Sequence, residues 1–307
     1  MEKHTFGNEY GFQTRAVHTG NDIDAETGAI KRPITMANSY SLPYDPSDLN
    51  WSSAGKNLYT RNGGSNQQYL QEKLASLEGG EDCVVLASGV AALSGLFFAL
   101  LESGDHVVFS SVTYIAVYRL LNELLKNKFH VDTTIVDTSD LEAVKKAIRP
   151  NTKLVHIETP GNPTLTISDI RAIADIAHEN GALLSVDNTF ASPYNQRPIE
   201  LGADFTVESL TKYINGHGDA MGGAILGACS GTPTVRRYED FHGWKLVLYT
   251  RIPGAERLEI PIGKRKKTAV TGHGSRRILK GQDLVDELRH ELENLEFEAD
   301  LDDPDFV

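Results

Sequence analysis

The sequence has few cysteines and no long apolar run. Its 307 residues include two cysteines, Cys83 and Cys229, whose spacing forms no disulfide framework. This usage predicts a reducing, cytoplasmic compartment. There is no stretch of about 18 apolar residues, and the polar N-terminus lacks the apolar segment of a secretory signal. We therefore expect a soluble protein with no membrane partner, and we predict no metal site.

Positive charge is also scarce. The formal net charge is −12 at pH 7, which disfavours nucleic acid as a partner because its phosphates repel an acidic surface. Hydrophobic residues make up 40% of the chain and charged residues 23%, the balance of an ordinary globular protein. At about 150 residues per domain, the length predicts one large or two ordinary domains.

Apolar strands alternate with helices over residues 67–227. After a first helix from Gln67, strands are expected at 83–86, 106–110, 131–136, 154–157, 183–186 and 205–207, and helices at 90–101, 114–125, 141–148 and 170–179. Ser139 and Glu142 are expected to form a capping box on the helix at 141–148. The alternation predicts an α/β fold with a mainly parallel sheet covered by helices on both faces. Ligands of such sheets bind at the carboxyl ends of the strands.

The stretch at 205–223 places a lysine at one of these ends. Phe205 to Val207 forms the expected strand, and Ser209, Thr211 and Lys212 follow it. A lysine becomes a nucleophile toward a carbonyl in a site of low dielectric, and two hydroxyls can hold a phosphate. Pyridoxal 5'-phosphate (PLP) offers both groups, although a solvated surface lysine remains the alternative.

Three other strand ends carry groups that suit the same cofactor. Ser88-Gly89-Val90 opens a helix directly after a strand, where free N–H groups and the helix dipole attract a phosphate. The loop Glu158 to Pro163 presents Asn162, and Asp187 ends an apolar strand, where a carboxylate needs a cationic partner such as a protonated pyridine nitrogen. A structural turn and a capping aspartate are the alternatives here.

Residues 1–66 are rich in Gly, Pro, Asn and Tyr and are expected to form an N-terminal arm. Within it Tyr59 and Arg61 are an anion-binding pair, because the guanidinium fork matches phosphate oxygens. An ordinary surface arginine is the alternative. Arms of this kind often reach a neighbouring subunit.

Short motifs in a fixed order then identify a family. They include AVHTG at 16–20, YTR at 59–61, LEGGED at 77–82, SGVAAL at 88–93, ETPGNPT at 158–164, DNTFASPYNQRP at 187–198 and LTKYINGHGD at 210–219. From about Gly11 to Gly227 the chain resembles the trans-sulfuration, or Cys/Met-metabolism, family of PLP-dependent enzymes. The resemblance implies the type I PLP-dependent transferase fold and a homodimer or homotetramer.

The resemblance also implies a role for each motif residue. Lys212 matches the lysine that forms the Schiff base with PLP and moves the α-proton. Asp187 matches the partner of the pyridine nitrogen, Asn162 the residue near the ring hydroxyl, and Tyr114 the tyrosine that stacks on the ring. The remaining matches are the phosphate cup, Gly89, Val90, Ser209 and Thr211, and the arm that crosses to a neighbour's phosphate, Tyr59 and Arg61.

Among the chain's departures from the family, two bear most on the site and on the substrate. Glu208 stands where a histidine is usual, and the expected Leu-Ser-x-Gly context of the arginine that binds the substrate carboxylate is missing after residue 228. We predict an N-terminal arm at 1–66, a PLP-binding α/β domain at 67–227 and an atypical C-terminal segment of unknown fold at 228–307. A helix is expected from Gln282.

The predicted function is that of a PLP-dependent carbon–sulfur lyase or transferase acting on a sulfur amino acid such as cystathionine, homocysteine or methionine. The missing carboxylate clamp supports an alternative, a catalytically degenerate or truncated PLP-binding member of the family. A purely structural or interaction protein has only the acidic C-terminus in its favour.

Overall fold

The computed structural model describes residues 9–42, 59–61 and 63–227, together with the backbone at 234–240, 243–250 and 258–259. All of these lie within the compact unit Met1–Lys264. The predicted helix from Gln282 falls outside the described residues. So does the rest of the C-terminal segment beyond these three strands.

A seven-stranded sheet forms the centre of the fold. Its strands lie in the order β1-β7-β6-β5-β4-β2-β3. Their bounds are β1 Asp82–Leu86, β2 His106–Ser110, β3 Asp132–Val136, β4 Thr152–Glu158, β5 Leu183–Asp187, β6 Phe205–Glu208 and β7 Gly223–Gly227. The pairs from β6 to β3 are parallel, and β7 runs antiparallel to both β1 and β6. The predicted mainly parallel sheet is confirmed.

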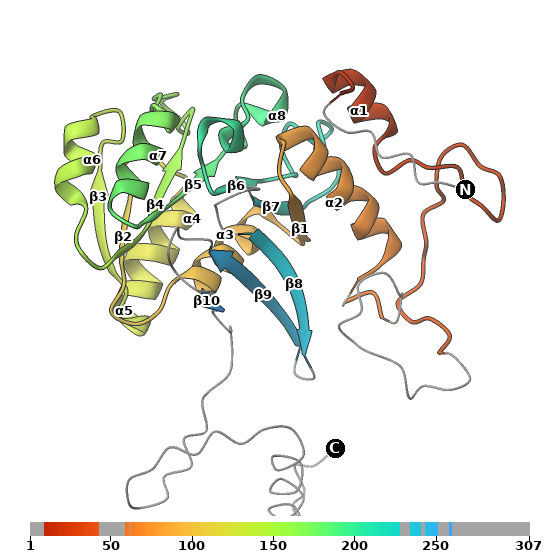
Figure 1. Ribbon diagram of the computed structural model, residues 1–307, viewed down its shortest axis with the longest axis horizontal. Coiled ribbons are helices and arrows are strands. Elements are labelled where there is room, and N and C mark those ends of the chain that lie inside the picture. The colour runs from red at the N-terminus through yellow and green to blue at the C-terminus, as the bar shows by residue number, and fades with distance from the viewer. Residues whose placement is uncertain are drawn as a thin grey trace, which may run out of the picture. The chain divides into compact units, whose positions relative to one another are not determined.

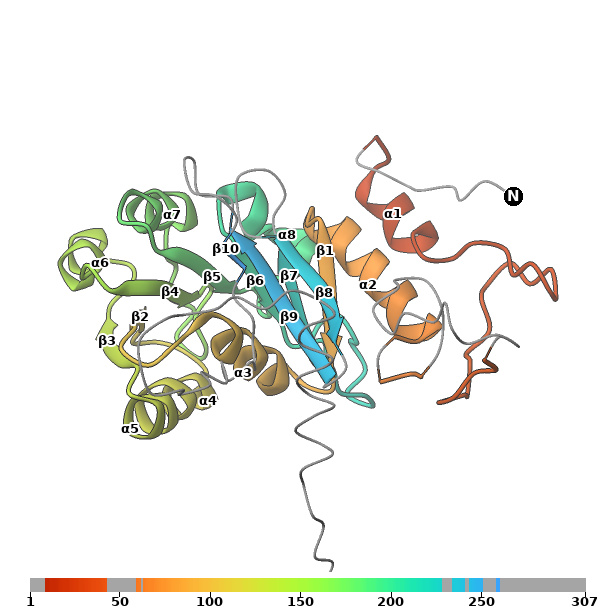
Figure 2. The ribbon, with the colours of Figure 1, turned by 60° about the horizontal axis from the view of Figure 1, so that its bottom comes forward.

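Helices cover both faces of this sheet (Figures 1 and 2). On one face lie α3 Gly89–Leu100, α4 Ile115–Tyr118, η1 Arg119–Leu125 and α5 Lys126–Phe129. On the other lie α2 Ser65–Glu78, α6 Leu141–Ala147 and α7 Ile170–Glu179, with the short α8 Ser192–Asn195 and η2 Pro198–Leu201 near the ends of β5 and β6. The alternation of side chains along the strands produces these two layers. On β7, for example, Ile225 packs with the α3 layer, whereas Ala224 and Leu226 pack with Leu74 of α2.

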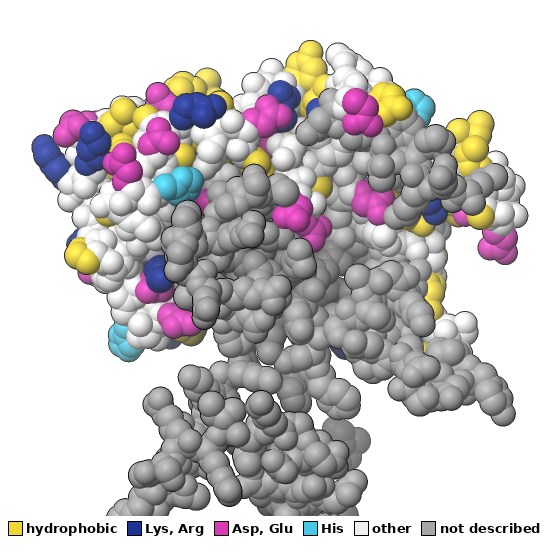
Figure 3. All heavy atoms as spheres, viewed as in Figure 1, with side chains coloured by type: hydrophobic (Ala, Val, Ile, Leu, Met, Phe, Trp, Pro, Cys, Tyr) yellow, Lys and Arg dark blue, Asp and Glu magenta, His cyan; other side chains and the backbone are white. Residues whose placement is uncertain are grey.

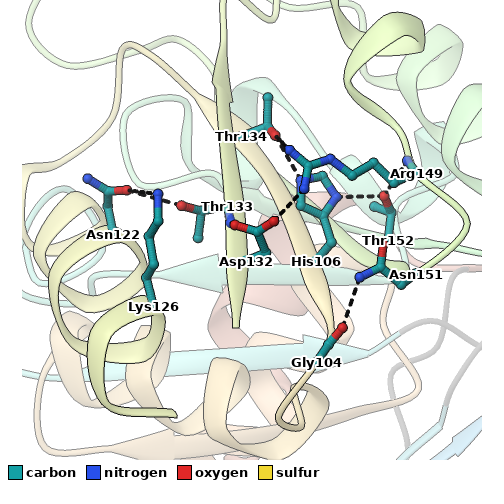
Figure 4. Close-up of polar contacts among 10 residues, drawn as sticks. All are labelled: Gly104, His106, Asn122, Lys126, Asp132, Thr133, Thr134, Arg149, Asn151 and Thr152. Atoms are coloured by element: carbon teal, nitrogen blue, oxygen red, sulfur yellow. Dashed lines mark hydrogen bonds and ion pairs between the residues drawn. The ribbon is translucent and has the colours of Figure 1, made fainter. Parts of the chain in front are cut away.

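A polar cluster joins the amino-terminal ends of β2, β3 and β4 (Figure 4). The ring of His106, which is fully buried, contacts the hydroxyl of Thr152 through Nδ1 at 2.7 Å and that of Thr134 through Nε2 at 2.8 Å. Arg149 forms an ion pair with Asp132 beside it. Burial lowers the pKa of His106, so a neutral ring bridges three strands at the edge opposite their carboxyl ends.

Three local expectations were wrong or incomplete. The cap of α6 is Asp140, whose carboxylate accepts from the N–H groups of Glu142 and Ala143, while the hydroxyl of Ser139 donates to Asp137. The predicted capping box is therefore absent, because the neighbouring aspartate captures the hydroxyl. The expected helix at 114–125 continues to Phe129 and contains a π-helical turn, η1. β7 was not predicted at all.

The arm and the segment after β7 have some regular structure. The helix α1 Phe12–His18 contacts α2, where Lys73 donates to the carbonyl of Ala16 at 2.6 Å. After β7, the strands β8 Thr234–Asp240, β9 Gly243–Thr250 and β10 Leu258–Glu259 form an antiparallel sheet in the order β10-β9-β8. Sequence patterning assigned no fold to these residues. The division into an arm at 1–66, an α/β domain at 67–227 and a C-terminal segment at 228–307 stays a prediction.

Acidic and basic side chains are mixed on the surface around α6 and α7 (Figure 3). One exposed pair there is Lys145 with Glu142, at 3.2 Å. Such pairs contribute little to stability. Within the part of the chain that the structure describes, no helix has both the length and the apolar character needed to span a bilayer.

Gly223 should be essential for folding. A Cβ atom at this position would lie 2.1 Å from the carbonyl oxygen of Ser88, and neither backbone can move without shifting a strand. We expect Gly223→Ala to lower the free energy of unfolding by about 3 kcal/mol or more, measured by urea denaturation. Gly95→Ala is the control, because its Cβ would meet only side chains at 3.5 Å or more, and it should stabilise α3 by up to about 1 kcal/mol. Equal effects of the two changes would contradict this account.

Candidate active site

A cavity of about 610 Å³ opens at the carboxyl ends of β4, β5 and β6. Most of the residues singled out from the sequence line it. They are Gly89, Val90, Tyr114, Asn162, Asp187, Ser209, Thr211 and Lys212. Tyr59 and Arg61 do not line it, and the guanidinium of Arg61 instead lies 5.0 Å from the centre of the Tyr59 ring.

One corner of the cavity is suited to an anion. This anion corner is formed by Ser88, Gly89, Val90 and Ser209. Ser88 caps α3 by accepting from Ala91 through its hydroxyl at 3.1 Å and from Ala92 through its carbonyl at 3.0 Å. The amides of Gly89 and Val90 are the remaining donors of this first helical turn. Only glycine fits at 89, because a Cβ there would lie 2.8 Å from Cβ of Ser209. The close approach sets amide N–H groups, the helix dipole and a serine hydroxyl around one point.

The turn that carries Lys212 is held by its own backbone. Lys212 donates its N–H to the carbonyl of Ser209 at 3.1 Å, and Gly216, at φ +76°, donates to the carbonyl of Lys212 at 2.8 Å. The hydroxyl of Thr211 donates to the carbonyl of Gly222 at 3.3 Å and accepts from its N–H at 3.2 Å. Thr211 thus closes the loop as well as lining the cavity. The Lys212 side chain is exposed at the cavity wall.

Asp187 is a buried carboxyl at the end of β5, with 6% of its surface exposed. Burial raises the pKa of Asp187, and hydrogen bonds from Thr189 oppose that change, among them a backbone N–H at 3.1 Å from Oδ1. A cationic group placed against this carboxyl would favour its ionised form. Thr189 also accepts from the N–H of Ser209 through its hydroxyl at 2.8 Å, which links the ends of β5 and β6.

Glu158 is a second carboxyl beside Asp187, and the sequence analysis missed it. The two residues are register partners in the parallel pair β4–β5. Glu158 accepts from the N–H of Tyr114 at 2.6 Å through Oε2 and from the N–H of Asn162 at 2.9 Å through Oε1. It therefore fixes two loops that line the cavity. Burial, and then the charge of Asp187, raise the pKa of Glu158 to about 7, against the effect of the two N–H donors.

The signals for Glu158 and Thr189 were present in the sequence. Glu158 is the last residue of an apolar strand, and Thr189 follows a strand-end aspartate at the spacing of an Asx turn. Phe190, Tyr213 and Met221 also line the cavity and supply part of its apolar wall. Within the described residues, no group of three or more His, Cys, Asp or Glu side chains could hold a metal ion.

The cavity therefore combines an anion-binding helix N-terminus, a lysine and a buried carboxyl in a type I PLP-dependent α/β fold. This donor set, and the cradle that a Cβ at Gly89 would fill, fit a phosphate and a pyridine ring. The family model for "Cys/Met metabolism PLP-dependent enzyme" matches residues 13–244. The chain belongs to this family, which confirms the predicted family, fold class and cofactor.

Individual relatives agree with this assignment. The chain is 56% identical over 227 residues to a canavanine γ-lyase of Rhizobium leguminosarum bv. trifolii. The matched region covers 74% of this chain and 56% of that protein. The chain is also 42% identical over 222 residues to an L-methionine γ-lyase of Porphyromonas gingivalis, covering 71% of this chain and 55% of that protein. The chain thus spans about half the length of the relatives that it matches.

Solved structures share the fold. The metB structure from Corynebacterium glutamicum has a TM-score of 0.68 and 40% sequence identity, covering 72% of this chain and 56% of that one. A cystathionine γ-lyase from Lactobacillus plantarum, complexed with L-serine, has a TM-score of 0.66 and 38% identity, covering 72% and 55%. At these identities the likeness extends beyond the fold to the sequence.

Glu158 gives a direct test of the site's construction. In Glu158→Gln, one acceptor oxygen becomes an NH₂ group that faces an N–H donor, so one buried hydrogen bond is lost. The free energy of unfolding should fall by about 1–3 kcal/mol in urea denaturation. Glu179→Gln, at an exposed position on α7, is the matched control and should leave it unchanged. A Glu158→Gln variant as stable as this control would show that the lost N–H contact contributes nothing to the free energy of unfolding.

Proposed function

We propose that the chain binds PLP in this cavity and forms the cofactor-binding part of an enzyme that eliminates the γ-substituent of an amino acid. The observation that carries the proposal is the presence of Lys212, Asp187 and the Gly89–Ser209 corner around one cavity. They come from three parts of the sheet: the end of β5, the turn after β6 and the start of α3. Their meeting at the carboxyl edge of the sheet is what a ligand site in this fold requires.

The anion corner would bind the phosphate of the cofactor. The amides of Gly89 and Val90 and the hydroxyl of Ser209 act as donors, and the dipole of α3 adds a favourable field. Thr211 stabilises the neighbouring loop through the two hydrogen bonds of its hydroxyl to Gly222. A phosphate anchored here fixes one end of the ring relative to Lys212.

Asp187 would hold a proton on the pyridine nitrogen. When bound, PLP supplies an electron sink for the α-carbon of the substrate. Lys212, which lines the same cavity, would serve as the base that removes and returns the α-proton. Tyr114 is 42% exposed and lines the cavity, so its ring could stack on the cofactor, and Asn162, which also lines it, would face the ring hydroxyl.

The reaction type is inferred from the relatives. Two of the relatives are γ-lyases by name, one of canavanine and one of L-methionine. We propose a lyase rather than a synthase, with a sulfur amino acid or canavanine as substrate. Both kinds of substrate carry a heteroatom on the γ-carbon that can leave with the bonding electrons.

The arm is proposed to serve a second copy of the chain. Arg61 is exposed, and neither it nor Tyr59 lines the cavity of its own chain. The anion corner contains amide and hydroxyl donors but no arginine. An arginine from a neighbouring chain would supply the missing charge for a phosphate dianion, so we infer a homodimer or homotetramer.

Lys212 should be the residue that bonds to PLP. Borohydride treatment of the PLP-loaded chain, followed by peptide mapping, should place the phosphopyridoxyl label on Lys212. Lys212→Ala should lose the label and all turnover, while the anion corner still retains PLP non-covalently. Lys153→Ala, at an exposed position on β4, is the control and should keep the label. A label on Lys153 or Lys245 would overturn the site assignment.

The substrate can be chosen by direct comparison. The purified chain with PLP is given methionine, homocysteine, cystathionine and canavanine in turn, and chromatography follows the loss of each amino acid. We expect elimination from at least one of them, with thiol release where the leaving group is sulfur. A chain that carries the Lys212 label but consumes none of the four would be the catalytically degenerate family member, and the proposed elimination would be wrong.

A further inference from the structure

Two glutamates meet in the buried layer between α2 and the sheet, next to the ends of β5 and β6. Glu78 is the last residue of α2, and Glu208 is the last residue of β6, directly before Ser209 of the anion corner. Their exposed fractions are 0% and 1%. Both carboxyl groups contact the same side-chain nitrogen, Nδ2 of Asn188, which brings them close together. Neither residue lines the cavity.

A single amide group serves both carboxyls. Nδ2 of Asn188 lies 3.1 Å from Oε1 of Glu78, 3.0 Å from Oε1 of Glu208 and 2.9 Å from the carbonyl of Gln196. An amide nitrogen has two hydrogens, so it cannot satisfy all three acceptors fully. The Oε2 atoms of both glutamates are buried and have no other hydrogen-bond partner among the described residues. Two ionised carboxylates in this position would be severely under-satisfied.

Among the described residues, no cationic side chain is in contact with the pair. Arg197 lowers the pKa of Glu78 from a distance, but its guanidinium is engaged with Glu200 at 2.7 Å. Glu200 itself raises the pKa of Glu78, and Asp187 raises that of Glu208. Burial is the largest cause for both glutamates, and it acts in the same direction. One proton held between the two carboxyls therefore leaves one buried charge in place of two, and the remaining carboxylate accepts a hydrogen bond from that proton.

We propose that Glu78 and Glu208 share one proton and that this protonated pair, through Asn188, positions the ends of β5 and β6 that carry Asp187 and Ser209 into the cavity. The pair would act as a positioning device and not as catalytic residues. Asn188 directly follows Asp187, and its Oδ1 accepts from Gln196 at 2.9 Å. Gln196 also donates to the carbonyl of Thr159 at 2.8 Å, which extends the network to the end of β4. The positioning part rests on the proposed function, whereas the shared proton does not.

The shared proton predicts a sign for the pH dependence of stability. A carboxyl whose pKa is raised on folding binds its proton more tightly in the folded chain. The stability that this proton contributes is therefore fully present below the ordinary glutamate pKa of about 4.3, and it is lost as the pH rises through the raised value. For one proton, the unfolding constant increases by at most about tenfold per pH unit in this window. A glutamine at either position supplies an N–H donor at all pH values in place of the shared proton, so it should reduce this contribution.

The experiment compares the full chain with Glu208→Gln, Glu78→Gln and the control Glu123→Gln, which lies at an exposed position on η1. Glu158 also has a raised pKa, so infrared difference spectra between about pH 5 and about pH 8 should contain a protonated-carboxyl band in all four proteins. That band should be weaker in both pair variants than in the full chain and the control. The free energy of unfolding in urea should likewise fall less steeply over this pH range in the pair variants. Equal band intensity and equal slope in all four proteins would overturn the shared proton. Having two pair variants keeps the test decisive if one fails to fold.

The positioning part is read from cofactor release. We expect the chain and Glu123→Gln to lose PLP faster as the pH rises through the window in which the pair loses its proton, and the two glutamine variants to lose that acceleration. Equal acceleration in all four would overturn the positioning role. This failure differs from a failure of the proposed function, in which PLP would not label Lys212 at all. The infrared band requires no bound PLP.

Discussion

The structure depends on the close approach of three backbone segments beneath the cavity. The turn at Ser88–Gly89 lies against Gly223, where β7 begins, and against Ser209, where β6 ends. Side chains at either glycine would meet atoms 2.1 and 2.8 Å away. Because β7 is antiparallel to β1 and β6, its first residue lies at the same edge as the last residues of those strands. The anion corner is therefore built by the packing of the sheet and needs no dedicated loop.

Three features of the site could be predicted from the sequence because each is local. Gly89 follows a strand and opens a helix, Asp187 ends an apolar strand, and Lys212 lies among small and hydroxyl residues. In a parallel sheet all such strand ends lie at one edge, so the alternation pattern already implied that they would meet. The cavity confirms the meeting of these three, while their chemical roles remain proposals.

The features that were missed depend on partners distant in sequence. The function of Glu158 comes from the N–H groups of Tyr114 and Asn162, and no pattern around Glu158 reveals that the Tyr114 loop is its neighbour. The strand Gly223–Gly227 is five residues long and wholly buried, so it shows neither alternation nor direction. Its antiparallel orientation is set by tertiary pairing. The capping box failed for a simpler reason, since two residues near Ser139 are aspartates that compete for the same contacts.

The buried carboxyls define the electrostatic character of the site. Glu158, Asp187, Glu78 and Glu208 all lie at the ends of strands or helices, and all are at most 6% exposed. Desolvation raises the pKa of each, and the charge of Asp187 further raises the pKa of Glu158 and of Glu208. Such a group of acids is stable only with few charges present, so protons or a cationic ligand must offset the rest. A ligand that brings a positive charge to Asp187 would thus gain from the surrounding acids as well as from Asp187 itself.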